Sequence, residues 1–149
     1  FTGECPGGNY FEELGGACYY FSSDHGETHN WQDSRDFCQE LGSLLSLNVD
    51  LAEVGNEASC MSDSLLMQKI TEKAEWVWLG ATDLNSEGYF KWSASGHSLS
   101  SKDSYWGYNE PNENSDENCL VAGILGEHHR AYFMDFGCDP PHAFVCQIF

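Results

Sequence analysis

The chain has 149 residues, 41% hydrophobic and 14% aromatic, a length that supports one packed core and is short for two. No run approaches the ~18 consecutive apolar residues of a membrane-spanning helix, so we expect no membrane insertion. The 24 acidic and 6 basic residues give a formal net charge of −18, and the sequence contains no basic cluster, so we expect no binding to nucleic acid or anionic lipid.

Turn residues, caps and hydrophobic periodicity predict the first half of the chain. Residues 5–21 combine turn types with aromatic positions and predict a short hairpin. A helix is predicted over 30–41, with Asn30 as its N-cap and Gly42 at its C-terminal cap. A second helix is predicted over about 62–73. The intervening segment 48–61 has weak periodicity and is read as a loop or an extension of that helix.

After residue 75 the pattern changes to short apolar and aromatic runs, which predict strands over 76–79, 89–92, 120–125, 131–136 and 143–148. Residues 93–118 consist mostly of turn and polar types, and an irregular loop of that length inside a small domain is more often functional than idle. Early helices followed by late strands predict an α+β fold. Since we find no repeat and no linker, we expect residues 1–149 to form a single domain.

The seven cysteines predict disulfides rather than a metal site, because no Cys-x-x-Cys pair and no Cys/His zinc pattern is present. Disulfides place a protein outside the cytosol. The chain opens at Phe1 without a methionine or a signal sequence, so we expect the mature form of a secreted, extracellular protein. The count alone leaves the pairing open.

Oxygen-bearing side chains in the long loop and the strand after it indicate a cation site. Calcium prefers six to eight oxygen ligands at ~2.3–2.6 Å, and the side chains that offer them are Glu110, Asn112, Glu117 and Asp135. A Cys119–Cys138 bridge would bring the loop and the strand together, and a cis peptide bond before Pro111 would let the flanking side chains aim at one point. About one residue in six is acidic, so the alternative is a solvated acidic face. No hydrolase or metalloprotease motif is present, and we predict no enzymatic activity.

Over essentially its whole length the chain resembles a C-type lectin-like domain of the long form. Trp78-Leu79-Gly80 is similar to the family's Trp-Ile-Gly signature, and Glu110-Pro111-Asn112 matches the Glu-Pro-Asn triplet that goes with mannose-type ligands. The resemblance implies an antiparallel sheet with two helices and a long calcium-binding loop, cross-linked by the disulfides Cys5–Cys18, Cys38–Cys146 and Cys119–Cys138. Cys60 is left over, and is either an interchain link in a homodimer or a buried, reduced thiol.

The resemblance also implies calcium as the cofactor, held at a primary site by Glu110, Asn112, Glu117 and Asp135, and at an auxiliary site by Asp83, Glu87 and Asn118. In the family, two adjacent sugar hydroxyls complete the coordination of the primary calcium. Carried over, Glu110 and Glu117 accept hydrogen bonds from the sugar and Asn112 donates one. The implied function is a secreted, calcium-dependent lectin for mannose-type vicinal hydroxyls on microbial or cell surfaces, with a role in innate immunity.

One departure from the family pattern concerns the strand before Cys138. Where the family usually has Trp-Asn-Asp, this chain has Phe133-Met134-Asp135, and a thioether does not replace the amide as a calcium ligand or a sugar donor. We therefore expect weaker binding, with the Met134 side chain packed against the sugar, and stronger binding of calcium and mannose by Met134→Asn. The alternative function is a domain of the same fold, calcium-binding or calcium-independent, that binds a protein or a mineral.

Overall fold

The computed structural model describes residues 5–55, 60–74, 76–99, 105–107, 110–111, 116–124 and 130–149, and of Cys60 the backbone only. These residues form two α-helices, eight strands and two 3₁₀ turns. The helices are α1 (Trp31–Leu45) and α2 (Cys60–Lys73), and the 3₁₀ turns are η1 (Gly8–Tyr10) and η2 (Ser22–His25). The strands are β1 (Glu12–Leu14), β2 (Ala17–Phe21), β3 (Val49–Leu51), β4 (Trp76–Thr82), β5 (Lys91–Trp92), β6 (Cys119–Ile124), β7 (Ala131–Phe136) and β8 (Ala143–Ile148).

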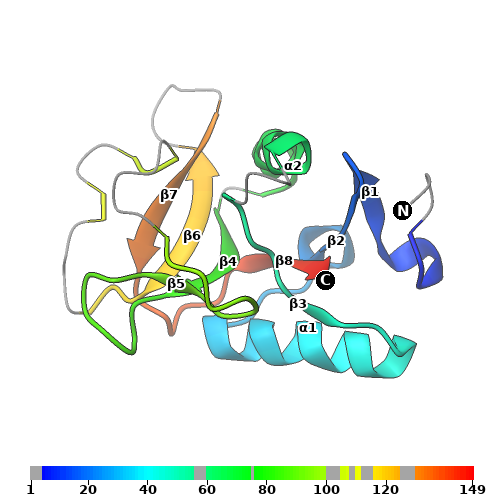
Figure 1. Ribbon diagram of the computed structural model, residues 1–149, viewed down its shortest axis with the longest axis horizontal. Coiled ribbons are helices and arrows are strands. Elements are labelled where there is room, and N and C mark those ends of the chain that lie inside the picture. Colours follow the sequence, from blue (N-terminus) through cyan, green and yellow to red (C-terminus); the bar gives the residue numbers. More distant parts are fainter. Residues whose placement is uncertain are drawn as a thin grey trace.

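The strands form a mixed, mostly antiparallel sheet between the two helices (Figure 1). Its order is β1-β2-β8-β4-β6-β7, with β3 also paired to β8 and β5 to β4. The β4–β8 pair is parallel, and the other pairs are antiparallel. The architecture is the predicted α+β fold. No helix within the described residues is long and apolar enough to cross a membrane.

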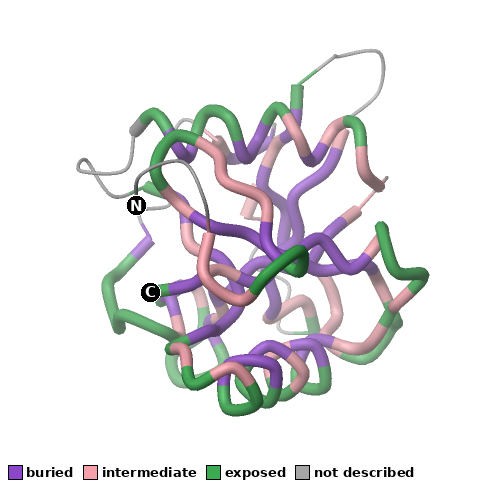
Figure 2. Tube along the Cα trace, turned by 90° about the vertical axis from the view of Figure 1, so that its right-hand side faces the viewer, coloured by how far each residue is buried: buried purple, intermediate pink, exposed green. Residues whose placement is uncertain are grey.

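Both faces of the sheet are buried, and β4 shows how the sequence produces this. Side chains alternate across a strand, so Val77 and Leu79 pack in the apolar cluster that contains Ile70 of α2. Trp78 points the other way, into a second cluster that contains Leu41 of α1. Figure 2 shows the result, with buried residues through the centre and exposed residues around the outside. The central strands are therefore held from both sides.

The predicted N-cap of α1 is confirmed, and its predicted end at Gly42 is wrong. Asn30 Oδ1 accepts a hydrogen bond from Asp33 N at 2.8 Å, as a capping residue does. The helix continues to Leu45, and Ser46 in the left-handed region (φ 58°) provides the C-cap. Gly42 is needed for packing instead, because a Cβ there would lie 2.6 Å from the carbonyl oxygen of Leu47.

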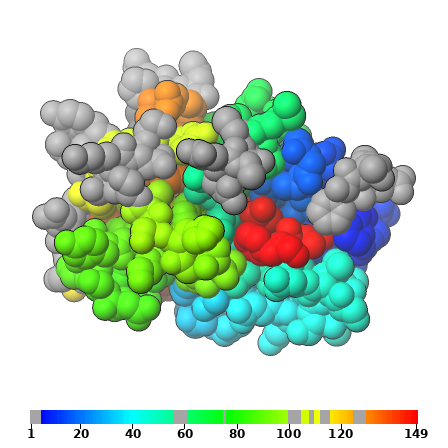
Figure 3. Space-filling view, in the orientation of Figure 1, coloured from blue at the N-terminus to red at the C-terminus, as the bar shows by residue number. Residues whose placement is uncertain are grey.

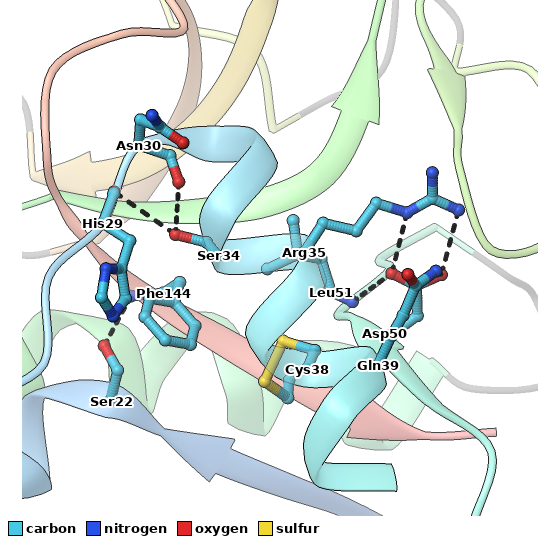
Figure 4. The surroundings of a disulfide bond; sticks show 11 residues. Ser22, His29, Asn30, Ser34, Arg35, Cys38, Gln39, Asp50, Leu51 and Phe144 are labelled. Carbon is cyan, nitrogen blue, oxygen red and sulfur yellow. Dashed lines mark hydrogen bonds and ion pairs between the residues drawn. A yellow bond between two sulfur atoms is a disulfide. The ribbon is translucent and has the colours of Figure 1, made fainter. Parts of the chain in front are cut away.

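All three disulfides implied by the resemblance are present, with Cα–Cα distances of 5.2–5.8 Å. Cys38–Cys146 joins α1 to β8 in the middle of the domain (Figure 4). Beside it, the Arg35 guanidinium donates two hydrogen bonds of 3.2 Å to the carboxylate of Asp50. A covalent bond and a charged pair thus fix α1 against the sheet.

The predicted second helix and five late strands are confirmed, with ends that differ by up to three residues. The N-terminal hairpin is present as β1 and β2, and it turns at Gly15 and Gly16, both with positive φ. The interpretation of 48–61 was incomplete, because it contains the strand β3, which pairs with β8. Three residues are too few for a periodic pattern, which is why the sequence does not show this strand.

Candidate functional site

The candidate site lies where the irregular segment before Pro111 runs beside β7, at the side of the sheet away from both termini (Figure 1). Phe133 N donates to the carbonyl oxygen of Tyr105 at 2.6 Å, and Gly107 N donates to the carbonyl oxygen of Phe133 at 3.0 Å. The ring of Trp106 is buried and packs edge-on against Phe133, with centroids 5.8 Å apart. These contacts fix the described part of the loop against the strand that carries Asp135.

These loop contacts bring the Glu110 side chain into contact with Asp135. Glu110 N donates to the carbonyl oxygen of Gly107 at 3.0 Å, which closes a turn directly before the cis Glu110–Pro111 bond. Asp135 N in turn donates to Glu110 Oε2 at 3.5 Å, and Asp135 is almost completely buried. Two carboxylates that are far apart in the sequence therefore meet at the edge of β7.

The charges at this point favour a cation. Burial, then the hydrogen bond and the charge of the Asp135 carboxyl, raise the pKa of Glu110 to about 8, and the charge of Glu117 adds to the effect. Without a positive partner, Glu110 therefore keeps a proton at neutral pH. The carboxyl oxygens of the half-buried Glu110 and the buried Asp135 are the type of ligand that a hard divalent cation prefers, and a cation would displace the proton of Glu110. The chemistry of these residues fits calcium.

Glu117 approaches Glu110 from the other side of the loop, closely enough for its charge to contribute to the raised pKa of Glu110. It lies two residues before Cys119, the first residue of β6, and Cys119 is bonded to Cys138 beyond the end of β7. The register of β6 and β7 pairs Leu120 with Asp135. The disulfide and the pairing of β6 with β7 therefore hold the end of the loop beside the strand that carries Asp135, as predicted from the Cys119–Cys138 bridge.

The described residues account for part of the predicted ligand set. Asn112 lies outside them, so its position relative to Glu110 stays a prediction. No three His, Cys, Asp or Glu side chains of the described chain converge closely enough to hold a metal by themselves. A complete calcium site at Glu110 and Asp135 would therefore depend on ligands such as Asn112, backbone carbonyls and the sugar.

Met134 does not face the site, and the expectation that it packs against a sugar is wrong. Its side chain is 4% exposed and lies in the apolar cluster on the α1 side of the sheet, with Trp78 and Val121. Since neighbours in a strand point to opposite faces, Met134 points away from the face that Asp135 presents to Glu110. The substitution thus fills the core beneath the site rather than its surface.

The predicted auxiliary ligands come together in part. Asp83 N donates to the carbonyl oxygen of Asn118 at 3.1 Å, which joins the turn after β4 to the residue before β6. The Asp83 carboxylate is buried, and its Oδ2 accepts from Gly88 N at 2.9 Å. Its Oδ1 has no hydrogen bond within the described structure. Glu87 lies in the same turn and is exposed.

An unpaired buried carboxylate oxygen is costly unless a donor or a cation satisfies it. Asp83 is therefore suited to act as a ligand of a cation. Asn118, whose carbonyl oxygen accepts from Asp83 N, lies beside it. Sequence reasoning found these residues through the resemblance alone. It missed that Tyr105 and Gly107 align the loop by backbone hydrogen bonds, which no side-chain pattern signals.

The comparisons with known proteins all point to the same family. The model of the Lectin C-type domain family matches residues 27–148. C-type lectin domain family 4 member M of Nomascus concolor is 30% identical over 132 residues, which make up 89% of this chain and 29% of that relative. The CD209 antigen of Pongo pygmaeus is 33% identical over 104 residues, 70% of this chain and 23% of that protein. The chain thus spans less than a third of the length of these relatives.

Two solved structures illustrate the range of proteins with this fold. The C-type lectin domain of murine dendritic cell inhibitory receptor 2, solved in complex with N-glycan, superposes with a TM-score of 0.73 at 19% identity, covering 97% of this chain and 98% of that one. A calcium-independent type II antifreeze protein superposes with a TM-score of 0.71 at 19% identity, covering 98% and 96%. At these identities the superpositions show the fold, which both proteins share with this chain.

Proposed function

The chain belongs to the C-type lectin domain family, and we propose that it is a calcium-dependent carbohydrate-recognition domain for glycans with mannose-type vicinal hydroxyls. The observation that carries the proposal is the contact between the half-buried Glu110 and the buried Asp135, two members of the predicted ligand set. The proposed calcium ligands are Glu110, Asn112, Glu117 and Asp135.

Calcium would supply positive charge and open coordination positions for two sugar hydroxyls. The residues of the chain set which hydroxyls fit. Glu110 and Glu117 accept hydrogen bonds through their carboxylates, and Asn112 donates one through its amide. A fixed order of acceptors and donor beside a charge selects the stereochemistry of neighbouring hydroxyls, because the wrong isomer leaves a charged group without its partner.

We assign Asp83, Glu87 and Asn118 to an auxiliary calcium that stiffens the long loop. The support is the buried Asp83 carboxylate, whose Oδ1 has no hydrogen bond in the described part of the chain. The backbone of Asp83 already binds that of Asn118, so a cation there would join the turn after β4 to the end of the loop.

The proposal also covers the location of the protein and a disulfide-linked dimer. Three disulfides in one small domain support a secreted, extracellular location, because the cytosol keeps thiols reduced. Recognition of microbial or cell-surface glycans, in innate immunity, would follow from the family. Cys60 is proposed to join two copies of the chain. Peptide mapping without reduction would show a Cys60–Cys60 peptide, and free alkylation of Cys60 would exclude that bond.

A glycan array probed in millimolar calcium, and again with a chelator, tests the function. We expect signals on mannose-, fucose- or N-acetylglucosamine-terminated glycans that disappear with the chelator. Monosaccharide affinity is low at a single site, so the array should be probed with a multivalent form of the protein. No signal on any of these glycans in calcium would reject the sugar specificity.

A second candidate rests on Met134. Residue 134 is a methionine whose side chain lies in the core on the α1 side, so it supplies the site with no amide oxygen. A domain of this fold that binds a protein, a mineral or ice without calcium is compatible with that loss, and a calcium-independent antifreeze protein has the same fold. An array that stays empty, together with a melting temperature unaffected by calcium, would favour this candidate.

A further inference from the structure

A pocket of about 310 Å³ opens between the two turns that flank β5, away from Glu110 and Asp135. None of the described residues that line it is a proposed calcium ligand, although Asp83 and Glu87 stand in the same turn. Its polar and aromatic lining includes Thr82, Asn85, Ser86, Tyr89, Lys91 and Ser93. In the space-filling view the segment that carries it, coloured green to yellow-green, lies at the molecular surface beside α1 (Figure 3).

The backbone of this pocket is fixed on both sides. Thr82 and Lys91 are directly paired across β4 and β5. In the first turn, Tyr89 N donates to the carbonyl oxygen of Ser86 at 2.9 Å, and Gly88 N donates to Asp83 Oδ2 at 2.9 Å. Both bonds join groups of the chain itself, and the second uses Oδ2 of Asp83, which is also a proposed ligand of the auxiliary calcium.

The second turn is held in the same way. Trp92 N donates to the carbonyl oxygen of His97 at 2.9 Å, and Ser93 N donates to the carbonyl oxygen of Gly80 at 2.7 Å. Trp92 itself is 4% exposed and packs edge-on against Phe133 in the core. The pocket is therefore anchored to the sheet, and a ligand would not need to order it.

The chemistry of the lining is that of a sugar site. Four hydroxyl groups, one amide and the Lys91 ammonium offer several donors and acceptors in a small space. At its rim stands Tyr89, whose side chain is 72% exposed and presents an apolar ring with a polar end. Among the described lining residues none is acidic, although the chain contains 24 acidic residues.

We propose that this pocket is a second, calcium-independent site for one neutral pyranose of the glucose type. In such a sugar all ring hydroxyls are equatorial, so each ring face is a row of C–H groups that can lie on Tyr89 while the hydroxyls point to Asn85, Ser86 and Lys91. The volume suits one ring. The net charge of −18 disfavours an anionic sugar.

The test is a titration of ¹⁵N-labelled protein with methyl β-D-glucopyranoside in EDTA, followed by amide resonances. We expect shifts confined to residues 80–97, with a dissociation constant on the order of 1 mM, as suits a ligand of this size. Tyr89→Ala should weaken binding about tenfold, whereas Tyr89→Phe should keep the affinity, since stacking needs the ring and not the hydroxyl. Leu84→Ala is the matched control, an exposed apolar residue of the same turn that does not line the pocket.

EDTA removes calcium from the primary site at Glu110 and Asp135, so sugar binding at that site and sugar binding in this pocket can fail independently. The proposal is overturned if no resonance in 80–97 shifts at 50 mM sugar, or if the shifts appear only in calcium. It is also overturned if Tyr89→Ala and Leu84→Ala bind equally well in EDTA. An unchanged amide spectrum elsewhere in Tyr89→Ala would show that this variant is folded.

Discussion

Met134 and Asp135 are neighbours in β7, and their side chains point to opposite faces of the sheet. Met134 is 4% exposed in the apolar cluster beneath α1, while Asp135 is 1% exposed and meets Glu110 of the long loop. A single strand thus carries a core residue and a proposed calcium ligand side by side. The alternation of strand side chains makes this possible without any change in the backbone.

This arrangement reverses the expected effect of Met134→Asn. The substitution would place an amide among Trp78 and Val121, where it leaves polar atoms without partners. We expect a loss of about 1–3 kcal/mol in the free energy of unfolding and no gain in calcium or mannose affinity. Urea denaturation without calcium measures the first, and calcium titration the second.

Met134→Leu is the control, because it keeps the apolar character and nearly the volume of the side chain. It should change the free energy of unfolding by less than about 1.5 kcal/mol. An asparagine variant that is as stable as Met134→Leu and binds calcium more tightly would show that residue 134 turns toward the loop.

Calcium should stabilise the protein through Glu110. At 100 times the dissociation constant, binding to the folded state alone adds ~2.7 kcal/mol to the free energy of unfolding. The melting temperature should therefore rise in calcium and fall in chelator. In Glu110→Gln a neutral amide replaces a carboxyl that is protonated at neutral pH without calcium, so we expect unimpaired stability without calcium and little response to it. Differential scanning calorimetry measures both.

Glu40→Gln serves as the matched control, since Glu40 is an exposed acid of α1 far from the loop in sequence and should leave the response to calcium intact. If wild type and Glu110→Gln gain the same stability in calcium, the ion binds elsewhere.

Sequence patterns predicted the parts of the fold that repeat or carry a local chemical signal. The apolar and aromatic run 76–79 predicted a strand, and the position of Asn30 before an amphipathic run predicted a helix cap. Gly42 was misread because a glycine after a helix and a glycine at a tight helix–strand contact look alike in sequence. Only the 2.6 Å approach of a Cβ to Leu47 O distinguishes them.

The site was predictable in its composition and only partly in its geometry. The acidic residues around Pro111 indicate an oxygen-rich site, and the family resemblance names its members. The direction of Met134 depends on the register between β6 and β7, where Val121 lies opposite Met134 and Leu120 opposite Asp135. A shift by one residue would exchange the two faces, and no local pattern fixes that register.

The Arg35–Asp50 pair should contribute to stability. Their side chains are 28% and 10% exposed, and Asp50 also accepts from Leu51 N at 2.8 Å (Figure 4). Asp50→Ala removes these bonds and leaves the guanidinium partly buried, so we expect a loss of about 2–3 kcal/mol in urea denaturation.

The surface pair of Lys69 and Glu12, 3.3 Å apart, provides the comparison. Lys69→Ala should change the free energy of unfolding much less than Asp50→Ala does, because ion pairs at the surface are weak. Equal losses in the two variants would contradict a special role for Arg35 and Asp50.

His142 should make the fold sensitive to mild acid. Its ring packs edge-on against Trp78 at 4.9 Å, and burial lowers its pKa from the ordinary value of 6.5. The unfolded chain therefore takes up the proton first, so stability is fully present above about pH 6.5 and declines as the pH falls toward the lowered pKa. The fall between pH 7.5 and 5 should be smaller in His142→Gln.

The backbone at His142 pairs with that of His29, whose ring binds Glu27 at 2.8 Å. His97→Gln, at an exposed histidine, is the control and should keep the wild-type dependence on pH. An identical acid profile for wild type and His142→Gln would locate the sensitivity in another group.

The most direct test of calcium-dependent sugar recognition is equilibrium binding of the wild-type protein to immobilised mannan at neutral pH. Binding should be saturable in 5 mM calcium, absent in EDTA, competed by free mannose and lost in Glu110→Gln. Binding of equal strength with and without calcium, or no binding in saturating calcium by a protein whose melting temperature calcium does raise, would contradict the proposed function.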